Sequence, residues 1–180
     1  EIARRVAALG GKVVAVKRRP AAPGDADLAP VGGDGGLGDA IDLRHGPDGL
    51  DAVLSESDVV VLCAPETSET RGLLDAAALA RMKDGALLVN VGRGKLVDED
   101  ALVAELRSGR LRGAALDVFA KEPLAPGHPL WEMPNVLVTP HVSAVTRGFW
   151  RRETELITEN VRRYLAGEPL LNLVDKTAGY

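Results

Sequence analysis

The sequence feature that most limits the possible folds is a set of short aliphatic runs. Each run is followed directly by polar or charged residues. The runs Val59-Val60-Val61-Leu62 and Ala86-Leu87-Leu88-Val89 are apolar at every position. A strand with one solvated face alternates apolar and polar residues, whereas a strand covered on both faces is apolar throughout. Segments with the apolar spacing of helices lie between the runs. This alternation predicts an α/β protein with a doubly wound parallel sheet, covered on both faces.

The expected strands and helices alternate along the chain. Strands are expected at residues 12–16, 40–43, 58–63, 85–91, 113–118 and 136–138. Helices are expected at residues 1–9, 49–55, 73–82, 98–108 and 146–166, with Gly167 just past the last one. Residues 20–38 are rich in Pro, Gly, Asp and Ala without periodicity, which predicts a loop.

Candidate functional residues follow the expected strands. They are Arg18 and Arg19, the segment 63–67, the segment 90–94, Asp117 and His141. In parallel sheets, ligands bind at the carboxyl ends of the strands, so these residues predict a single site at one edge of the sheet. An arginine can bind an anion, and a histidine backed by a carboxylate can donate a proton. Reduction of a 2-keto acid needs both functions.

Composition excludes several other classes of protein. The net charge of -4 is unlike that of a nucleic-acid-binding surface. No apolar run approaches the roughly 20 residues of a membrane-spanning helix. Cys63 is the only cysteine, so no internal disulfide can form, and no His/Cys spacing indicates a metal site. We therefore expect a cytoplasmic protein without a metal and without nucleic-acid or membrane partners.

One glycine pattern is misleading. Gly33, Gly35 and Gly38 match the spacing of a dinucleotide-binding fingerprint, which must follow a strand and begin a helix. Here Pro30 disrupts the preceding segment, and Asp34 would repel phosphate, so we expect a surface loop. The residues from Glu1 onward are those that normally follow a true fingerprint. We therefore expect that the chain lacks the first strand and the glycine-rich loop of its sheet.

Three motifs in a fixed order carry a resemblance to a known family. They are Asn90-Val91-Gly92-Arg93-Gly94, Leu116-Asp117-Val118-Phe119 with Glu122-Pro123-Leu124, and Thr139-Pro140-His141. With these motifs the sequence resembles the D-2-hydroxyacid dehydrogenases, which include glyoxylate and hydroxypyruvate reductases and phosphoglycerate dehydrogenase. The resemblance implies an NAD(P)-dependent 2-hydroxyacid dehydrogenase with a Rossmann-like domain.

The resemblance also implies a domain organisation. Residues 1–142 correspond to an incomplete dinucleotide-binding domain. Residues 143–180 correspond to a C-terminal helix and tail that return toward a substrate domain. We expect the full-length parent protein to be active and the 180-residue chain alone to be inactive.

The resemblance assigns catalytic roles to three residues. Arg93 corresponds to the arginine that binds the substrate carboxylate and polarises the adjacent ketone. His141 corresponds to the acid/base, which gives a proton to the carbonyl oxygen during reduction. Glu122 corresponds to the carboxylate partner of that histidine, which orients the imidazole ring.

The resemblance also indicates a cofactor site. Its residues are Lys17, Arg18, Arg19, Ala64, Pro65, Thr70, Val91, Gly92, Arg93, Asp117, His141 and Ser143. NAD-specific proteins of this fold have an acidic residue at the end of the second strand, where this chain has Lys17-Arg18-Arg19. Guanidinium groups bind a 2′-phosphate, so we expect NADP(H) to be preferred, with NAD(H) possible. One departure from the family is Glu66, where a leucine is common.

The resemblance further implies a homodimer and leaves other functions open. The apolar segment 123–131, with Leu124, Leu130 and Trp131, is either a dimer contact or a loop packed on its own domain. The chain could instead belong to a dinucleotide-binding regulatory protein of the same fold, or be the inactive product of a truncated gene. The presence of Arg93, Glu122 and His141 argues against the regulator.

Overall fold

The computed structural model describes residues 2–17 and 41–177. Arg18, Arg19, the expected loop at residues 20–38 and its misleading glycine pattern therefore lie outside the described residues.

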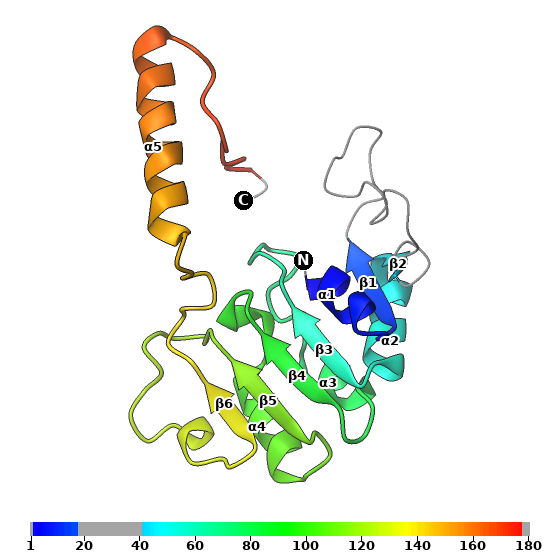
Figure 1. Ribbon diagram of the computed structural model, residues 1–180. Helices are drawn as coiled ribbons and strands as arrows, with labels where there is room; N and C mark the ends of the chain where they lie inside the picture. The colour runs from blue at the N-terminus through cyan, green and yellow to red at the C-terminus, as the bar shows by residue number, and fades with distance from the viewer. Residues whose placement is uncertain (1, 18–40, 178–180) are drawn as a thin grey trace.

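The described strands form two parallel sheets. The smaller sheet pairs β1 (Val13–Lys17) with β2 (Ile41–His45). The larger sheet has the order β3-β4-β5-β6, and its strands are Val59–Leu62, Leu87–Asn90, Gly113–Leu116 and Val136–Val138. All pairings are parallel, and the smaller sheet lies on the β3 side of the larger one (Figure 1). The predicted α/β, Rossmann-like fold class is confirmed, although β1 and β3 are not hydrogen-bonded to each other.

Helices alternate with these strands, as predicted. They are α1 (Ile2–Ala8), α2 (Gly46–Glu56), α3 (Ala76–Arg81), α4 (Glu99–Arg107) and α5 (Phe149–Ala166). Aspartates fix two of the starts, because Asp75 accepts a hydrogen bond from Ala78 N and Asp98 accepts one from Ala101 N. Two short 3-10 helices, η3 (Gly94–Leu96) and η4 (Pro129–Trp131), were not predicted.

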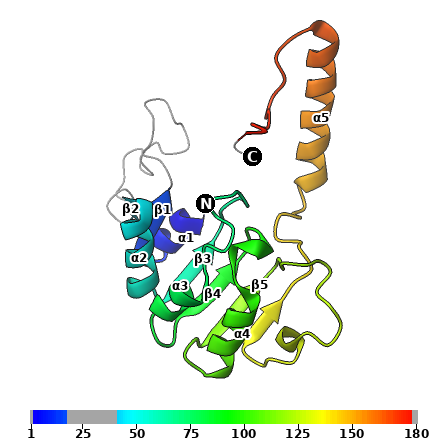
Figure 2. The ribbon, with the colours of Figure 1, turned by 180° about the vertical axis from the view of Figure 1, so that it is seen from behind.

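The core lies between the larger sheet and the helices α3 and α4. Both helices lie behind this sheet in Figure 1 and in front of it in Figure 2. Alternate strand residues point to them and are buried, including Val60, Leu88 and Leu116. The same alternation places the remaining strand residues on the opposite face.

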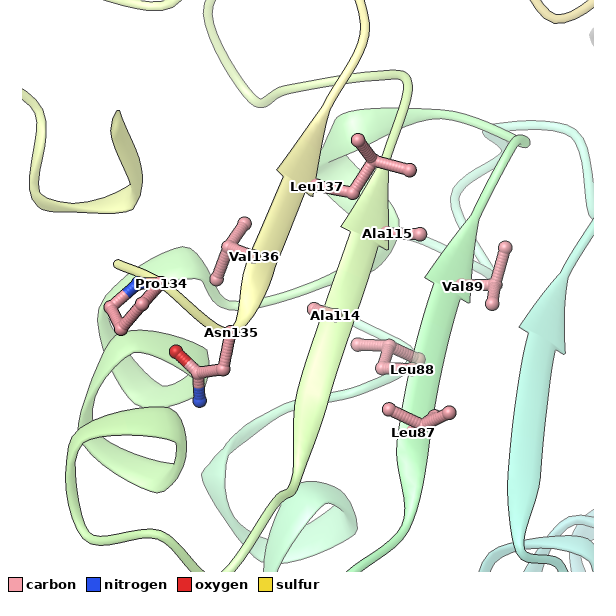
Figure 3. Close-up of a pocket in the computed structure, with 9 residues that line it drawn as sticks. All are labelled: Leu87, Leu88, Val89, Ala114, Ala115, Pro134, Asn135, Val136 and Leu137. Atoms are coloured by element: carbon pink, nitrogen blue, oxygen red, sulfur yellow. The ribbon is translucent and has the colours of Figure 1, made fainter. Parts of the chain in front are cut away.

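The exposure of this opposite face contradicts the prediction that the strands are covered on both faces. Val59 is 45% exposed and Val61 36% exposed, so β3 is not covered on both faces among the described residues. Leu137 on β6 is 63% exposed. The strands β4, β5 and β6 also line an open hollow of about 410 Å³, whose walls include Ala115 and Leu137 (Figure 3). The apolar run therefore predicted the strand correctly, but the burial of the strand that we inferred from it was too high.

Helix α5 extends away from both sheets (Figures 1 and 2). None of its residues is buried, and Ile157, Tyr164 and Leu165 are more than half exposed. Gly167 ends it in a left-handed conformation with a φ of 69°, at the position that the sequence predicted. Within residues 2–17 and 41–177, no helix is both long and apolar enough to cross a membrane.

Arg110 links the ends of two helices, and its loss should destabilise the domain. Its guanidinium donates hydrogen bonds to the carbonyl oxygens of Leu79 and Met82 at the end of α3 and pairs with Glu105 on α4. Because Arg110→Ala would leave these acceptors without their donor, we expect the free energy of unfolding to fall by about 2 kcal/mol. Urea denaturation measures this loss. The exposed Arg107, replaced by alanine, is the matched control and should change stability by less than about 0.5 kcal/mol. Equal effects of the two variants would contradict this role.

Candidate active site

The loops that follow β3, β4 and β5 pack against one another at the carboxyl edge of the larger sheet. A Cβ atom on Gly92 would lie 2.8 Å from the carbonyl oxygen of Ala64. A Cβ atom on Gly94 would collide with the backbone of Phe119 and Ala120. Only glycine permits both approaches. The expected cofactor loops around Ala64 and Gly92 therefore do lie together.

Asn90 shapes the turn that presents Arg93. It is the last residue of β4 and is 1% exposed. Its side-chain oxygen accepts a hydrogen bond from Gly92 N at 3.0 Å, and its amide donates to the carbonyl oxygen of Arg93 at 3.0 Å. The Arg93 side chain is exposed, and its Nη1 donates to the carbonyl oxygen of Gly92 at 2.7 Å. The Asn90 side chain thus hydrogen-bonds to the backbone of the turn that follows it and holds the backbone of Arg93 in place.

His141 and Glu122 form a hydrogen-bonded pair, as the sequence analysis expected. His141 Nδ1 lies 2.7 Å from Glu122 Oε2, and Glu122 Oε1 accepts a hydrogen bond from Phe119 N at 3.0 Å. Burial raises the pKa of Glu122. The hydrogen bonds from His141 and Phe119 N, with the charges of His141 and Arg93, outweigh burial and hold this pKa below its ordinary 4.5. Glu122 is therefore a carboxylate near neutral pH, which makes Nδ1 the donor and leaves Nε2 to exchange a proton.

Asp117 anchors the turn that carries His141. It is 3% exposed, and its Oδ1 accepts hydrogen bonds from Thr139 Oγ1 at 2.5 Å and from Val142 N at 2.9 Å. Its Oδ2 accepts from Ser143 N at 2.8 Å. Burial raises the pKa of Asp117, but the hydrogen bonds from Thr139, Ser143 and Val142 lower it far below its usual range.

The backbone of His141 shows why this anchor matters. Its φ is 56°, a left-handed conformation that is unfavourable for a residue with a side chain. Such conformations persist where surrounding contacts enforce them. The three hydrogen bonds to Asp117, on both sides of His141 in sequence, supply that enforcement.

The segment after β3 is folded by two threonines. Thr70 Oγ1 donates to the carbonyl oxygen of Pro65 at 2.7 Å and accepts a hydrogen bond from Thr67 N at 2.8 Å. Glu66, the departure from the family pattern, pairs with Arg71 at 2.6 Å and lies 3.8 Å from Lys95 Nζ. Glu66 thus connects this segment to the turn that carries Arg93.

The cofactor residues predicted at 17–19 are not tested by this geometry. Lys17 is the last residue of β1, and Arg18 and Arg19 lie outside the described residues. Of the two alternatives for segment 123–131, packing on its own domain holds for Leu124 and Leu130, because both are buried in the core. Trp131 is 53% exposed.

Sequence reasoning assigned no role to Asn90 or Thr139. The signal for Asn90 was an asparagine at a strand end, two residues before a glycine, which is typical of a side-chain-bonded turn. No local signal identifies Thr139, because its partner Asp117 lies 22 residues earlier.

A parallel α/β sheet whose carboxyl edge holds an exposed arginine and a histidine–carboxylate pair is the arrangement of a dinucleotide-dependent oxidoreductase domain. The sequence model of the family described as "D-isomer specific 2-hydroxyacid dehydrogenase, NAD binding domain" matches residues 1–143, and the chain belongs to this family.

Solved structures of relatives agree with this assignment. A D-isomer specific 2-hydroxyacid dehydrogenase from Xanthobacter autotrophicus Py2, in complex with NADPH and MES, is 43% identical, with a TM-score of 0.82 over 99% of this chain and 66% of that chain. An NADPH-dependent glyoxylate/hydroxypyruvate reductase from Sinorhizobium meliloti, in complex with NADP and sulfate, is 34% identical, with a TM-score of 0.81 over 99% of this chain and 52% of that chain.

A curated relative covers the chain less completely. An uncharacterized protein encoded in the proB 3′ region of Corynebacterium melassecola is 44% identical over 133 residues, which are 74% of this chain and 44% of that protein. The chain thus spans less than half of this relative and about half to two thirds of the two solved structures.

Proposed function

We propose that the full-length parent protein reduces a small 2-keto acid, such as glyoxylate or hydroxypyruvate, to the 2-hydroxy acid with NADPH. The hydrogen bond of 2.7 Å between His141 and Glu122 carries this proposal, because it orients an imidazole at the carboxyl edge of the sheet. Membership of the 2-hydroxyacid dehydrogenase family supports the same reaction class.

Each of the three side chains has one task in this reaction. Arg93 binds the substrate carboxylate and polarises the neighbouring ketone. His141 donates the Nε2 proton to the carbonyl oxygen as the hydroxyl forms, and it takes this proton back in the oxidation direction. Glu122, ionised at neutral pH, stabilises the imidazolium and fixes the ring plane.

The loops at the carboxyl edge fit the nicotinamide end of a dinucleotide. The close packing of Gly92 on Ala64 and of Gly94 on Phe119 brings backbone from three strand ends together, at the edge where parallel sheets bind ligands. When bound, the dinucleotide supplies the hydride. The residues expected near it are Ala64, Pro65, Thr70, Val91, Gly92, Asp117 and Ser143. The hydrogen bonds of Asp117 give this residue a second task, because they hold the turn that carries His141.

The direct test is oxidation of NADPH by the purified full-length parent protein with glyoxylate, hydroxypyruvate and other small 2-keto acids. Turnover with at least one of them is expected. A protein that binds NADPH but turns over none of these acids would favour the regulatory function instead. A homodimer is part of the proposal, and a monomer in light scattering at micromolar concentration would contradict it.

The preference for NADPH depends on the basic segment Lys17-Arg18-Arg19, which occupies the position of the acidic residue of NAD-specific proteins. Replacing Arg18 by alanine should lower kcat/KM for NADPH about 10- to 150-fold and leave kcat/KM for NADH unchanged, because the 2′-phosphate loses a charge-assisted hydrogen bond of about 1.5–3 kcal/mol. Arg107→Ala on α4 is the control for loss of an arginine. Equal losses with NADPH and NADH, or a wild-type preference for NADH, would refute this prediction.

A further inference from the structure

The loop that carries Glu122 has no helix or strand of its own. From Asp117 until η4 begins at Pro129, the backbone is irregular. A loop of this kind holds a side chain in place only if its backbone is tied to a regular element. The contacts of this loop with α4 therefore decide how firmly Glu122 faces His141.

Glu99, in the first turn of α4, makes the decisive contact. Its Oε1 accepts a hydrogen bond from Ala120 N at 2.6 Å, although the two residues are 21 positions apart. The preceding N–H group, that of Phe119, donates to Glu122 Oε1 at 3.0 Å. The N–H groups of Phe119 and Ala120, which are adjacent in the backbone, thus donate hydrogen bonds to two different carboxylates, those of Glu122 and Glu99. A shift of this short segment moves both hydrogen bonds at once.

The far end of the loop also approaches Glu99. His128 Nε2 lies 4.0 Å from Glu99 Oε2, and both side chains are about one fifth exposed. His128 Nδ1 accepts a hydrogen bond from Leu130 N and so caps the start of η4. Gly94 packs against the Phe119–Ala120 peptide itself. The Arg93 turn, α4 and the Glu122 loop therefore meet at one peptide.

We propose that Glu99 is a positioning residue that holds the Phe119–Ala120 peptide and thereby keeps Glu122 against His141. The proposal rests on the proposed function for its effect on turnover. Stabilisation of the start of α4 by negative charge does not require a glutamate at position 99, because Asp98 and Asp100 also place negative charge there. The reach of the Glu99 side chain to Ala120 distinguishes it from both aspartates.

The test compares variants of Glu99 in the full-length parent protein. Glu99→Ala and Glu99→Asp remove the acceptor from the reach of Ala120 N, and Asp keeps the charge that favours the start of a helix. We expect both to lower kcat about 10-fold while KM for the keto acid and for NADPH changes less than about 2-fold. Glu99→Gln keeps an acceptor oxygen and should stay within about 3-fold of wild type. Asp100→Ala, an exposed neighbour, is the control and should leave kcat unchanged.

A second measurement does not depend on which reaction is catalysed. Titration of the Glu122 carboxyl group by carbon-13 NMR should give a pKa below the ordinary value in the wild type and in Glu99→Gln. In Glu99→Asp it should move back toward the ordinary value, because the hydrogen bonds from Phe119 N and His141 weaken. If Glu99→Asp leaves both kcat and this titration unchanged, the positioning role is wrong, whatever the substrate is. If the wild type turns over no keto acid, the proposed function fails, and the titration still decides the role of Glu99.

Discussion

Replacing His141 by alanine should lower kcat of the full-length parent protein about 100-fold or more. The variant loses the group that we propose as the proton donor to the carbonyl oxygen, and general acid catalysis by a positioned imidazole contributes about 10²- to 10⁴-fold. The Nδ1–Glu122 hydrogen bond of 2.7 Å orients this group, so its loss affects the chemical step more than binding. We therefore expect KM for NADPH to change little.

Steady-state oxidation of NADPH with a saturating keto acid measures this effect. Val145→Ala is a suitable control, because Val145 lies four residues beyond His141 and is 54% exposed. Glu122→Gln should give a smaller loss than His141→Ala, because glutamine still accepts from Nδ1 but lacks the charge that favours imidazolium. An unchanged kcat in His141→Ala would remove this residue from the mechanism.

Replacing Asp117 by alanine should lower the free energy of unfolding by about 3 kcal/mol. The substitution leaves Val142 N, Ser143 N and Thr139 Oγ1 without their acceptor. A hydrogen bond to a charged group contributes about 1.5–3 kcal/mol, and water that reaches these partly exposed groups reduces the sum of the three losses. Local amide exchange reports the same loss, since the amides of Val142 and Ser143 should exchange much faster. Asp84→Ala, whose side chain is 87% exposed, is the control and should change stability little. Wild-type exchange at both amides would contradict the anchoring role of Asp117.

The lowered pKa of Asp117 adds a pH dependence with a defined sign. A carboxyl group whose pKa is lower in the folded state than in the unfolded state stabilises the fold fully above its unfolded pKa. This contribution is lost as the pH falls below about 4, the ordinary value for aspartate. The stability difference between the wild type and Asp117→Asn should therefore be largest near neutral pH and shrink in acid. A constant difference from pH 7 to pH 2 would contradict the assignment.

The elements were predictable because their signals are local. The runs around Val60 and Leu88 predicted β3 and β4, and Asp98 marked the start of α4 to within one residue. The exposure of Val59 and Val61 was not predictable from the run, because composition says nothing about whether another element covers the face.

The site was predictable in part. The resemblance to the family identified Glu122 and His141, and the structure brings them together as expected, while their catalytic roles remain predictions. The contacts that hold them could not be read from the sequence. Asp117 meets Val142 across 25 residues and Glu99 meets Ala120 across 21, and no periodicity relates positions so far apart. Only the fold defines such pairs.

The isolation of α5 has a consequence for how the chain melts. This helix buries no residue. Its supports are ion pairs along its own surface, such as those of Glu159 with Arg162 and Arg163, and hydrogen bonds to the tail that follows it, such as those between Asn160 and Leu171. An 18-residue helix without tertiary packing is marginal in water, and such pairs weaken with salt. We therefore expect the sheet and α5 of this chain to unfold as separate cooperative units. If the thermal loss of helix content is fitted as one transition, the fit merges the unfolding of α5 with that of the sheet. The van't Hoff enthalpy from this fit should then be smaller than the enthalpy measured by calorimetry.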